Sequence, residues 1–509
     1  MAKKQNTISR FNLVACIMVI QLVLFVVLLY VVVNLSLILL VGSYLISFAI
    51  VLVLVKKDEE PAYKIAWLLI VVLVPFFGGI LYLLFGNKQP SRRLSKRINK
   101  EHHLIAEHLK QDESVIKKIK AEDSRMAGCM EYVQRSSRYA VYQDTNVKYY
   151  PFGEEMFVDM LAELKKAEKF ILMEYYIISD SDMWDQILEV LVAKAESGVD
   201  VRLIYDGAGS LNLFSMAYIH KLRTANIKVV AFNPILPLFS LVMNNRDHRK
   251  IMVIDGKVVF NGGINISDEY INQNKRLGVW KDTGTRLRGD AVRSFTFMFI
   301  EIWNSFCKVE ERINHHEAYL DAEHEVKDEG FVQPYGDTPF DDERLGESIY
   351  IEILNQARGY VYIFTPYLII SDTMIHAMKM AAKRGVDVRI VTPGKPDYKT
   401  IYNVTRSYYR YLTGAGVKIY EYTPGFLHGK SFVCDDEVAV VGTINLDYRS
   451  LYLNFECATL FYKSSVIKDV KKDALNTIEE SKQIAPRDLK YNFWNEFFDA
   501  VLHLFAPLM

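Results

Sequence analysis

The chain has 509 residues, half of them hydrophobic, with 61 acidic and 61 basic residues. This length exceeds what one compact core usually accommodates, so we expect more than one structural unit. The formal charge of zero gives no global attraction to nucleic acid. Five scattered cysteines lack metal-ligand spacing, and their odd number argues against a disulfide framework. The composition therefore indicates a reducing compartment and no structural metal.

The first 87 residues are predicted to form a transmembrane region. No charged residue occurs from Phe11 to Val55, and a helix of that length would extend about 68 Å, twice the roughly 30 Å hydrocarbon core of a bilayer. Two spans are therefore expected, connected near residues 34–36 or 42–43. A third apolar stretch, Ile65 to Phe85, contains a proline and two glycines. It predicts either a third span or a re-entrant segment.

A basic segment follows the apolar region. Between Lys88 and Lys100 there are only basic charges and no acidic residue. Positive charge beside membrane segments favours the cytoplasmic side, so we expect a multi-pass protein of the cell membrane with a cytoplasmic catalytic part. Residues 88–135 are interpreted as a basic juxtamembrane linker, either solvated or bound to anionic lipid head groups.

From about Tyr139 onward, apolar β-branched runs alternate with helical patterns. The sequence predicts a strand over Phe170–Ile178, a helix over Met183–Glu196 and a strand over Val199–Tyr205. This alternation is typical of α/β architecture with mixed sheets flanked by helices.

The same order then recurs later in the chain. Gly198–Arg202 returns as Gly385–Arg389, and a repeat of this length predicts two domains of one fold. We place them at residues 136–330 and 331–485. The first copy has an extra apolar loop, 235–243, which either receives acyl chains or packs on its own domain. An amphipathic segment, 486–509, is expected either at the membrane interface or packed on the catalytic part.

One motif, H-x-K-x-x-x-x-D, occurs at the same place in both copies. A glycine and then an asparagine follow each motif at the same spacing. The first set is His248, Lys250, Asp255, Gly262 and Asn265, and the second is His428, Lys430, Asp435, Gly442 and Asn445. Two matches in register are a strong indication of a shared site. The Asp255-Gly256 pair also predicts a tight hairpin turn.

These residue types suit a phosphodiester. Lysine ammonium groups and asparagine amides would stabilise the charge that develops on the phosphate oxygens. One imidazole would attack phosphorus while the other protonates the leaving oxygen, giving a covalent phospho-histidine and a bell-shaped pH profile. Each imidazole needs an acceptor on its second nitrogen, and Asp282 and Glu456, downstream of the two motifs, are the candidates for these orienting carboxylates.

The paired motifs resemble the phospholipase D superfamily, and several further runs resemble the bacterial cardiolipin synthases within it. These runs are 245–250, 262–266, 442–450, 454–456 and, near the amino terminus, 61–67. The resemblance implies transfer of a phosphatidyl group from one phosphatidylglycerol to another at a bilayer, with release of glycerol and without cofactor or metal. By position it makes His248 the nucleophile and His428 the acid and base.

The same resemblance implies the other roles. The catalytic set is His248, Lys250, Asp255, His428, Lys430 and Asp435, with Asn265 and Asn445 binding substrate and Asp282 and Glu456 orienting the imidazoles. The alternatives are a hydrolytic phospholipase D or another phosphatidyltransferase, a nuclease, and a catalytically silent membrane scaffold. The apolar amino terminus argues against nucleic acid as a substrate, and the sequence leaves the oligomeric state open.

Overall fold

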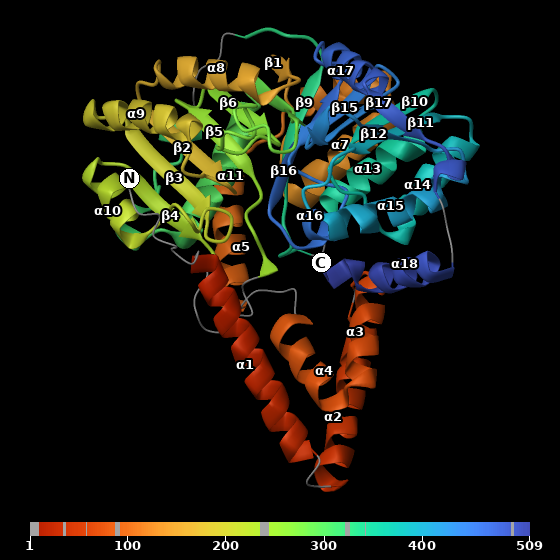
Figure 1. The fold of residues 1–509 in the computed structure, drawn as a ribbon. Coiled ribbons are helices and arrows are strands. Elements are labelled where there is room, and N and C mark those ends of the chain that lie inside the picture. The colour runs from red at the N-terminus through yellow and green to blue at the C-terminus, as the bar shows by residue number, and fades with distance from the viewer. Residues whose placement is uncertain are drawn as a thin grey trace, which may run out of the picture.

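The structure is a computed structural model and describes residues 10–33, 37–57, 59–86, 92–234, 244–320, 326–341, 343–489 and 493–508. The predicted helix connection at 34–36 and the apolar loop 235–243 lie outside these residues. Figure 1 shows a broad body that contains two β-sheets and a narrow helical stem that projects from it.

The first sheet has seven strands in the order β1-β8-β6-β5-β2-β3-β4. Its strands are β1 (Thr145–Tyr150), β2 (Phe170–Tyr175), β3 (Asp200–Asp206), β4 (Lys228–Phe232), β5 (Lys250–Ile254), β6 (Val258–Gly262) and β8 (Gly284–Gly289). Strands β2, β3 and β4 are parallel, and the remaining neighbours are antiparallel. Every residue of β2, β5 and β6 is buried, as expected for central strands covered on both faces.

The second sheet repeats this order and adds one strand, giving β17-β12-β11-β10-β14-β15-β16-β9. Its strands are β9 (Phe331–Asp337), β10 (Tyr360–Phe364), β11 (Asp387–Pro393), β12 (Lys418–Tyr422), β14 (Ser431–Cys434), β15 (Val438–Gly442), β16 (Glu456–Tyr462) and β17 (Ser481–Ile484). Strands β10, β11 and β12 are again parallel. The predicted duplication of one mixed α/β fold is therefore confirmed.

Local turn chemistry is also duplicated. After β5 the chain reverses through Asp255 and Gly256, whose φ angles are 53° and 67°, and after β14 it reverses through Asp435 and Asp436, at 51° and 60°. Two successive positive φ angles are characteristic of a two-residue hairpin turn whose twist matches that of the strands. The predicted hairpin is confirmed in both copies.

Helices cover the sheets. In the first repeat α8, α9 and α10 pack on one face, while α11 packs on the other and also contacts β9 of the second sheet. These helices are α8 (Gly153–Leu164), α9 (Asp182–Glu196), α10 (Met216–Thr224), α11 (Val292–Phe306) and the short α12 (Glu317–Leu320). The second repeat carries α13 (Leu345–Gln356), α14 (Asp372–Lys383), α15 (Lys399–Thr413), α16 (Tyr448–Tyr452) and α17 (Ile467–Glu479). Nearly every residue of α11 is buried, because it lies between the two sheets.

The segment predicted to be a basic linker is helical. It folds into α5 (Arg92–Ala106), α6 (Glu113–Glu122) and α7 (Ser124–Ser137). Helix α5 packs against α11, where His102 Nδ1 lies 3.0 Å from Glu301 Oε1. Arg312, which follows α11, donates to Glu101 of α5 at 2.5 Å. Of the basic residues themselves, Arg97 donates to the carbonyls of Asn304 and Cys307. The segment is thus tied to the body by packing and polar contacts, which the charge pattern alone did not reveal.

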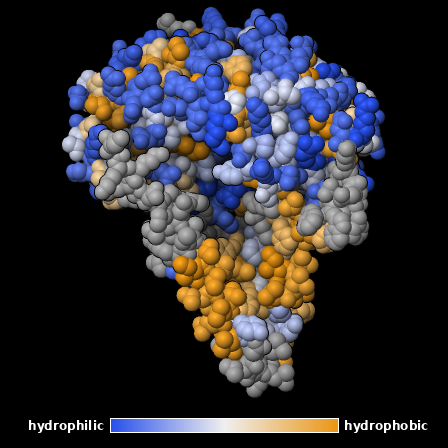
Figure 2. All heavy atoms as spheres, viewed as in Figure 1, coloured by the Kyte–Doolittle hydropathy of each residue, from blue (hydrophilic) through white to orange (hydrophobic). Residues whose placement is uncertain are grey.

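The stem consists of the amino-terminal helices α1 (Arg10–Val33), α2 (Leu37–Lys56), α3 (Pro61–Leu73) and α4 (Pro75–Leu81), followed by the π-helical turn η1 (Tyr82–Gly86). Figure 2 shows that its surface is mostly hydrophobic, in contrast to the hydrophilic body. Leu24 and Leu45, for example, are 64% and 66% exposed. Such a continuous apolar surface marks a site of interaction with a membrane or a protein.

In the portion of the chain that the structure describes, no helix combines the length and apolar character that crossing a bilayer requires. The structure therefore does not support the transmembrane helices predicted in residues 1–87. The third apolar stretch is divided at Val74, because Pro75 lacks the amide hydrogen that a continuous helix needs, and the chain restarts as α4.

The carboxy-terminal segment forms α18 (Phe493–Phe505) and packs on the body. His503 stacks on the ring of Tyr408, with 4.2 Å between ring centroids. Its Nε2 lies 2.7 Å from Ser407 Oγ, and both partners belong to α15. Helix α18 also contacts α3, so it joins the stem to the second repeat. Of the two interpretations of this amphipathic segment, packing on the body is the one observed.

Candidate active site

The two repeats meet through a pair of short strands and a backbone bridge. Strand β7 (Val279–Lys281) of the first repeat pairs in parallel with β13 (Gly425–Leu427) of the second. The backbone amide of His248 donates to the carbonyl of Phe455 at 2.9 Å, and that of His428 donates to Lys281 at 2.6 Å. Each motif histidine is therefore fixed by the backbone of the opposite repeat.

The histidine side chains cross the interface in the same way. His248 Nδ1 lies 2.9 Å from both carboxylate oxygens of Glu456, and His428 Nδ1 lies 2.5 Å from Asp282 Oδ2. Both carboxylates are fully buried. A carboxylate only accepts hydrogen bonds, so each pair places the proton on Nδ1 and leaves Nε2 available for chemistry.

Small residues near each carboxylate make these pairs possible. Thr443 Oγ1 donates to Glu456, and Asn454 Nδ2 lies 3.4 Å from the same carboxylate. Gly263 occupies the position equivalent to Thr443 in the first repeat. A Cβ there would stand 2.0 Å from Asp282 Oδ1, so only glycine lets this carboxylate enter. Gly263 thus makes room for the carboxylate of Asp282.

The two lysines are buried beside the histidines. Lys250 Nζ donates to the carbonyl of His248 at 2.5 Å, and Lys430 Nζ lies 2.8 Å from His428 Nδ1. Burial lowers the pKa of Lys250 to about 8, and burial together with the Lys250 charge lowers the pKa of Lys430 to about 7. The charges of these two buried side chains act on each other, and in their ammonium form the lysines offer a site for an anion.

The imidazoles are held in their neutral form in the free enzyme. Burial lowers the pKa of His248, aided by the Lys250 and Lys430 charges and opposed by Glu456. Burial and the Lys430 ammonium lower the pKa of His428 to about 3, although Asp282 opposes them. A bound anion would raise both values, because an opposite charge favours the protonated ring.

Aromatic rings, which the sequence analysis did not identify, surround both histidines. The ring of Tyr176 lies 5.1 Å from that of His248, while Tyr270 and Trp280 lie 5.5 and 5.4 Å from His428. Tyr176 directly follows the buried strand β2, and this position is the sequence signal that could have identified it as a site residue. These rings exclude water and fix the imidazole planes.

The two motif asparagines are placed differently from each other. Asn265 accepts the amide of Ile177 at 3.0 Å and donates to the hydroxyl of Tyr270 at 2.7 Å. Asn445 is 5% exposed, and its Oδ1 has no hydrogen-bond partner among the described residues. Of the two asparagines predicted to bind substrate, Asn445 is therefore the one whose side-chain oxygen is without a hydrogen bond to the described protein.

The motif aspartates do not lie in the site. Asp255 accepts the backbone amides of residues 168, 169 and 170 at 2.7–2.9 Å, and Asp435 accepts those of residues 358, 359 and 360 at 2.7–2.8 Å. They follow β5 and β14, at the ends of these strands that lie away from the histidines. The motif spacing carries them along the strand to the turn, where they hold the start of β2 and β10, so we propose a structural role for them in place of the predicted catalytic one.

Comparisons with known proteins identify the family. A family described as "Cardiolipin synthase, PLD-like domain" matches residues 160–303 and 350–477, and one described as "Phospholipase_D-nuclease N-terminal" matches residues 45–87. The cardiolipin synthase of Alkalihalophilus pseudofirmus is 34% identical over 457 residues, covering 89% of this chain and 90% of that protein. An uncharacterized protein of Streptococcus mutans is 44% identical over 461 residues, covering 90% and 99%.

A solved structure shows the same fold. The phosphatidylserine synthase of Haemophilus influenzae Rd KW20 superposes with a TM-score of 0.56 at 15% identity, covering 75% of this chain and 98% of that one. The duplicated fold, the extended match to curated relatives and the paired motifs lead to one assignment. The chain belongs to the cardiolipin synthase family, a phosphatidyltransferase family of the phospholipase D superfamily.

Proposed function

We propose that this chain is a cardiolipin synthase, which transfers a phosphatidyl group from one phosphatidylglycerol to another and releases glycerol. The observation that carries the proposal is the crossed arrangement of His248 with Glu456 and His428 with Asp282 beside two buried lysines. It offers two oriented imidazoles and two cations to one phosphodiester. Names of the curated relatives support the substrate class.

In the first step Nε2 of His248 attacks phosphorus. The bond between phosphorus and the glycerol oxygen breaks, and His428 supplies the proton to the departing oxygen. The phosphate enters as an anion between Lys250 and Lys430, and its charge raises the pKa of His428 from the low value of the free enzyme. The product of this step is phosphatidyl-His248 and free glycerol.

In the second step the neutral His428 accepts a proton from the hydroxyl of a second phosphatidylglycerol. The hydroxyl oxygen attacks phosphorus, the bond from phosphorus to Nε2 breaks, and cardiolipin forms. Water at about 55 M competes with this acceptor, so transfer requires a site that excludes water and a high local concentration of lipid. The buried histidines satisfy the first requirement.

A bilayer would satisfy the second requirement. We include in the proposal that the apolar stem attaches the body to the membrane, with exposed side chains such as Leu24 and Leu45 in contact with lipid. The basic charges between residues 88 and 100 favour the cytoplasmic side for the body. Labelling a single cysteine at position 100 in intact and in opened cells tests this orientation, since only opened cells should react.

Lipid analysis tests the activity. Purified protein in phosphatidylglycerol vesicles should convert them to cardiolipin with one glycerol released per cardiolipin, measured by mass spectrometry. Phosphatidic acid as the main product would instead identify a hydrolase, and the absence of any product would remove the enzymatic proposal. The His248→Ala and His428→Ala variants should each lose turnover, because one lacks the nucleophile and the other lacks the group that protonates the departing oxygen and deprotonates the acceptor.

A further inference from the structure

An apolar pocket lies where the stem meets the two repeats. Its volume is about 290 Å³, near the lower end of the roughly 300–1,000 Å³ usual for ligand pockets, so it accommodates part of one hydrocarbon chain and not a whole phospholipid. Val72 of α3 and Leu83 of η1 are 59% and 58% exposed, so the pocket adjoins the apolar surface of the stem. Its stem wall consists of side chains from α3, α4 and η1, namely Tyr63, Trp67, Ile70, Leu81 and Phe85.

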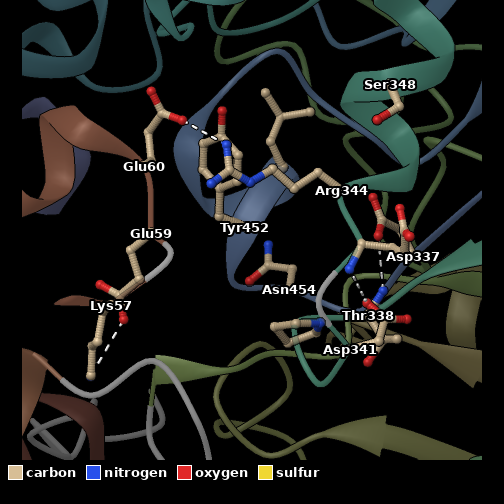
Figure 3. A pocket seen from close by; sticks show the side chains of 13 residues that line it. Lys57, Glu59, Glu60, Asp337, Thr338, Asp341, Arg344, Ser348, Tyr452 and Asn454 are labelled. Carbon is tan, nitrogen blue, oxygen red and sulfur yellow. Dashed lines mark hydrogen bonds and ion pairs between the residues drawn. The ribbon is translucent and has the colours of Figure 1, made fainter.

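Contacts between three parts of the chain hold this pocket in shape. Directly before α3, Glu60 Oε2 lies 2.8 Å from Arg344 Nη1 of the second repeat, and Figure 3 shows this contact beside a neighbouring polar cavity. In the first repeat, Asn244 donates to the carbonyl of Phe85 in η1 at 3.4 Å. The carbonyl of Asn244 in turn accepts from Arg449 Nη2 of α16 at 2.9 Å. The stem and both repeats therefore meet around the pocket.

Arg449 brings a cation without a counter-ion to this pocket. It is partly buried, and within the described residues its recorded hydrogen bond is to the carbonyl of Asn244, with no carboxylate at ion-pair distance. The nearby Arg246, in contrast, lies 3.6 Å from Asp206. A partly buried guanidinium favours a bound anion, and its planar set of donors matches the oxygens of a phosphate.

Tyr176 connects Arg449 with the catalytic groups. Its ring lies 5.1 Å from the ring of His248, and Lys250 Nζ lies 5.5 Å from its centroid. Because Lys250 Nζ faces the reacting phosphate in the proposed mechanism, Tyr176 stands on the side of His248 where that phosphate enters. Burial and the Asp206 charge raise the pKa of Tyr176, and the Arg449 charge opposes this rise. Arg449 is therefore within electrostatic range of the phosphate side of the active site.

We propose that Arg449 and this pocket form the subsite for the phosphatidylglycerol that accepts the phosphatidyl group. The reaction brings two phosphates to the enzyme, and Lys250 and Lys430 bind the one that is transferred. Arg449 binds the phosphate that the acceptor carries and keeps, while one acyl chain of the acceptor enters the apolar pocket. The free hydroxyl of its head group then reaches phosphatidyl-His248. The inference rests on the proposed function and refines it, because it gives the two lipids separate sites.

Two reactions of the same phospho-histidine separate acceptor recognition from donor recognition. In phosphatidylglycerol vesicles, cardiolipin synthesis uses a lipid acceptor. Isotope-labelled glycerol, which carries neither phosphate nor acyl chain, reverses the first step: its hydroxyl oxygen attacks phosphorus, its proton passes to His428, and the bond from phosphorus to Nε2 of His248 breaks. The product is labelled phosphatidylglycerol. Mass spectrometry measures both products in one sample, and the ratio of cardiolipin synthesis to glycerol exchange reports recognition of the lipid acceptor.

Replacement of the arginine tests the phosphate contact. Arg449→Gln should lower the ratio of synthesis to exchange about ten- to a hundredfold, because charged hydrogen bonds to the acceptor phosphate are lost. Arg449→Lys keeps a charge without the planar set of donors and should lower the ratio less. The matched control is Arg135→Gln, since Arg135 pairs with Glu131 on the exposed face of α7, and its ratio should equal that of the unmodified chain.

A variant of the stem wall tests the place of the acyl chain. Ile70→Trp fills part of the pocket and should lower the same ratio about threefold or more, because the chain no longer fits. Flotation with vesicles should be unchanged. The matched control is Leu73→Trp on the same helix, where the native side chain is 69% exposed, and its ratio should stay at the unmodified value.

Each other outcome overturns the inference in a distinct way. Equal losses of synthesis and exchange in Arg449→Gln would show that the arginine serves the donor or positions the catalytic groups. An unchanged ratio in this variant would exclude Arg449 from acceptor binding while leaving cardiolipin synthesis intact. An unchanged ratio in Ile70→Trp alone would remove the acyl chain from the pocket. Failure of the unmodified chain to catalyse the two reactions would instead refute the proposed function itself, whose first step is reversible.

Discussion

The Nδ1 atom of His248 lies 2.9 Å from the carboxylate of Glu456, although 208 residues separate the two in the chain. The equivalent pair, His428 and Asp282, crosses the interface in the opposite direction. Each repeat therefore contributes one imidazole and the carboxylate that orients the other. The active site therefore forms only at the interface between the repeats, because neither repeat contains both a histidine and the carboxylate that orients it.

Replacing either orienting carboxylate should reduce turnover strongly. In the Glu456→Gln and Asp282→Asn variants we expect kcat to fall on the order of 10²- to 10⁴-fold, because the imidazole loses its tautomer and its orientation. The Glu456 charge raises the pKa of His248. Loss of that charge should therefore lower the pKa of His248 and shift the corresponding limb of the pH profile to lower pH. Steady-state kinetics from pH 5 to 9 measures both effects. An unshifted profile at full rate would contradict the crossed pairing.

The lysines should produce a pH dependence of substrate capture. Their pKa values of about 7 for Lys430 and about 8 for Lys250 mean that the ammonium charges are present below this range and are lost as pH rises through it. Consequently kcat/KM should fall between pH 7 and 8. In the pH profile of kcat the corresponding decline should occur at higher pH, because bound phosphate raises the pKa values of both lysines.

A Lys430→Arg variant tests this origin. Arginine stays charged throughout the range, so the decline in kcat/KM should begin about one pH unit higher, near the Lys250 value. A decline at the same pH in both proteins would assign the titration to another group.

The motif aspartates should affect stability and leave chemistry intact. Asp255→Ala and Asp435→Ala each leave three backbone amides without their acceptor, which should cost about 1–3 kcal/mol of unfolding free energy. Thermal denaturation should show a lower Tm, with kcat of the folded enzyme within about twofold of the unmodified chain. The control is Asp290→Asn, which removes a long, exposed contact to Arg293. A large loss of kcat at unchanged Tm would return these residues to the catalytic set.

The two asparagines should behave differently from each other. Asn445→Ala should lower kcat/KM about three- to tenfold, as expected for the loss of one acceptor, Oδ1, that has no partner in the described protein and can accept from a substrate hydroxyl. Asn265→Ala should mainly lower Tm, because both ends of its amide bind the protein, at Ile177 and Tyr270. Equal kinetic losses in the two variants would show that the copies act symmetrically on the phosphate.

The stem should control attachment to lipid. Leu24→Asp and Leu28→Asp place charges on a surface where both leucines are more than 60% exposed. Because charges are strongly disfavoured in an apolar lipid environment, flotation with phosphatidylglycerol vesicles should recover much less of the double variant. The matched control is Val309→Asp, an exposed apolar residue of the body, which should float normally. Unchanged recovery of the double variant would mean that another surface binds the bilayer.

The duplicated fold could be predicted from the sequence because its signals are local. Helix α9 spans Asp182–Glu196, against a prediction of Met183–Glu196, and β3 spans Asp200–Asp206. Both depend on hydrophobic periodicity within a few residues. The Asp255-Gly256 hairpin was predictable for the same reason, since turn chemistry acts between neighbours.

The features that the sequence could not supply depend on distant contacts. Spacing within the motif could not show that Asp255 lies at the far end of a strand, where it accepts amides from residues 168–170. Nor could the charge of residues 88–100 reveal the packing of α5 on α11. Likewise Asp282 and Glu456 were recognised as candidate carboxylates, but the exchange of partners between repeats is set by the β7–β13 pairing, which has no local signature.

The pairing of each histidine with a carboxylate of the other repeat also determines when the active site can form during synthesis of the chain. Glu456 stands near the end of a chain of 509 residues, so His248 remains without its carboxylate while most of the polypeptide is being synthesised. The apolar helices of the stem leave the ribosome first and can reach lipid before the catalytic apparatus is assembled. The nascent protein is therefore inert until Glu456 has been synthesised and the second repeat has folded against the first.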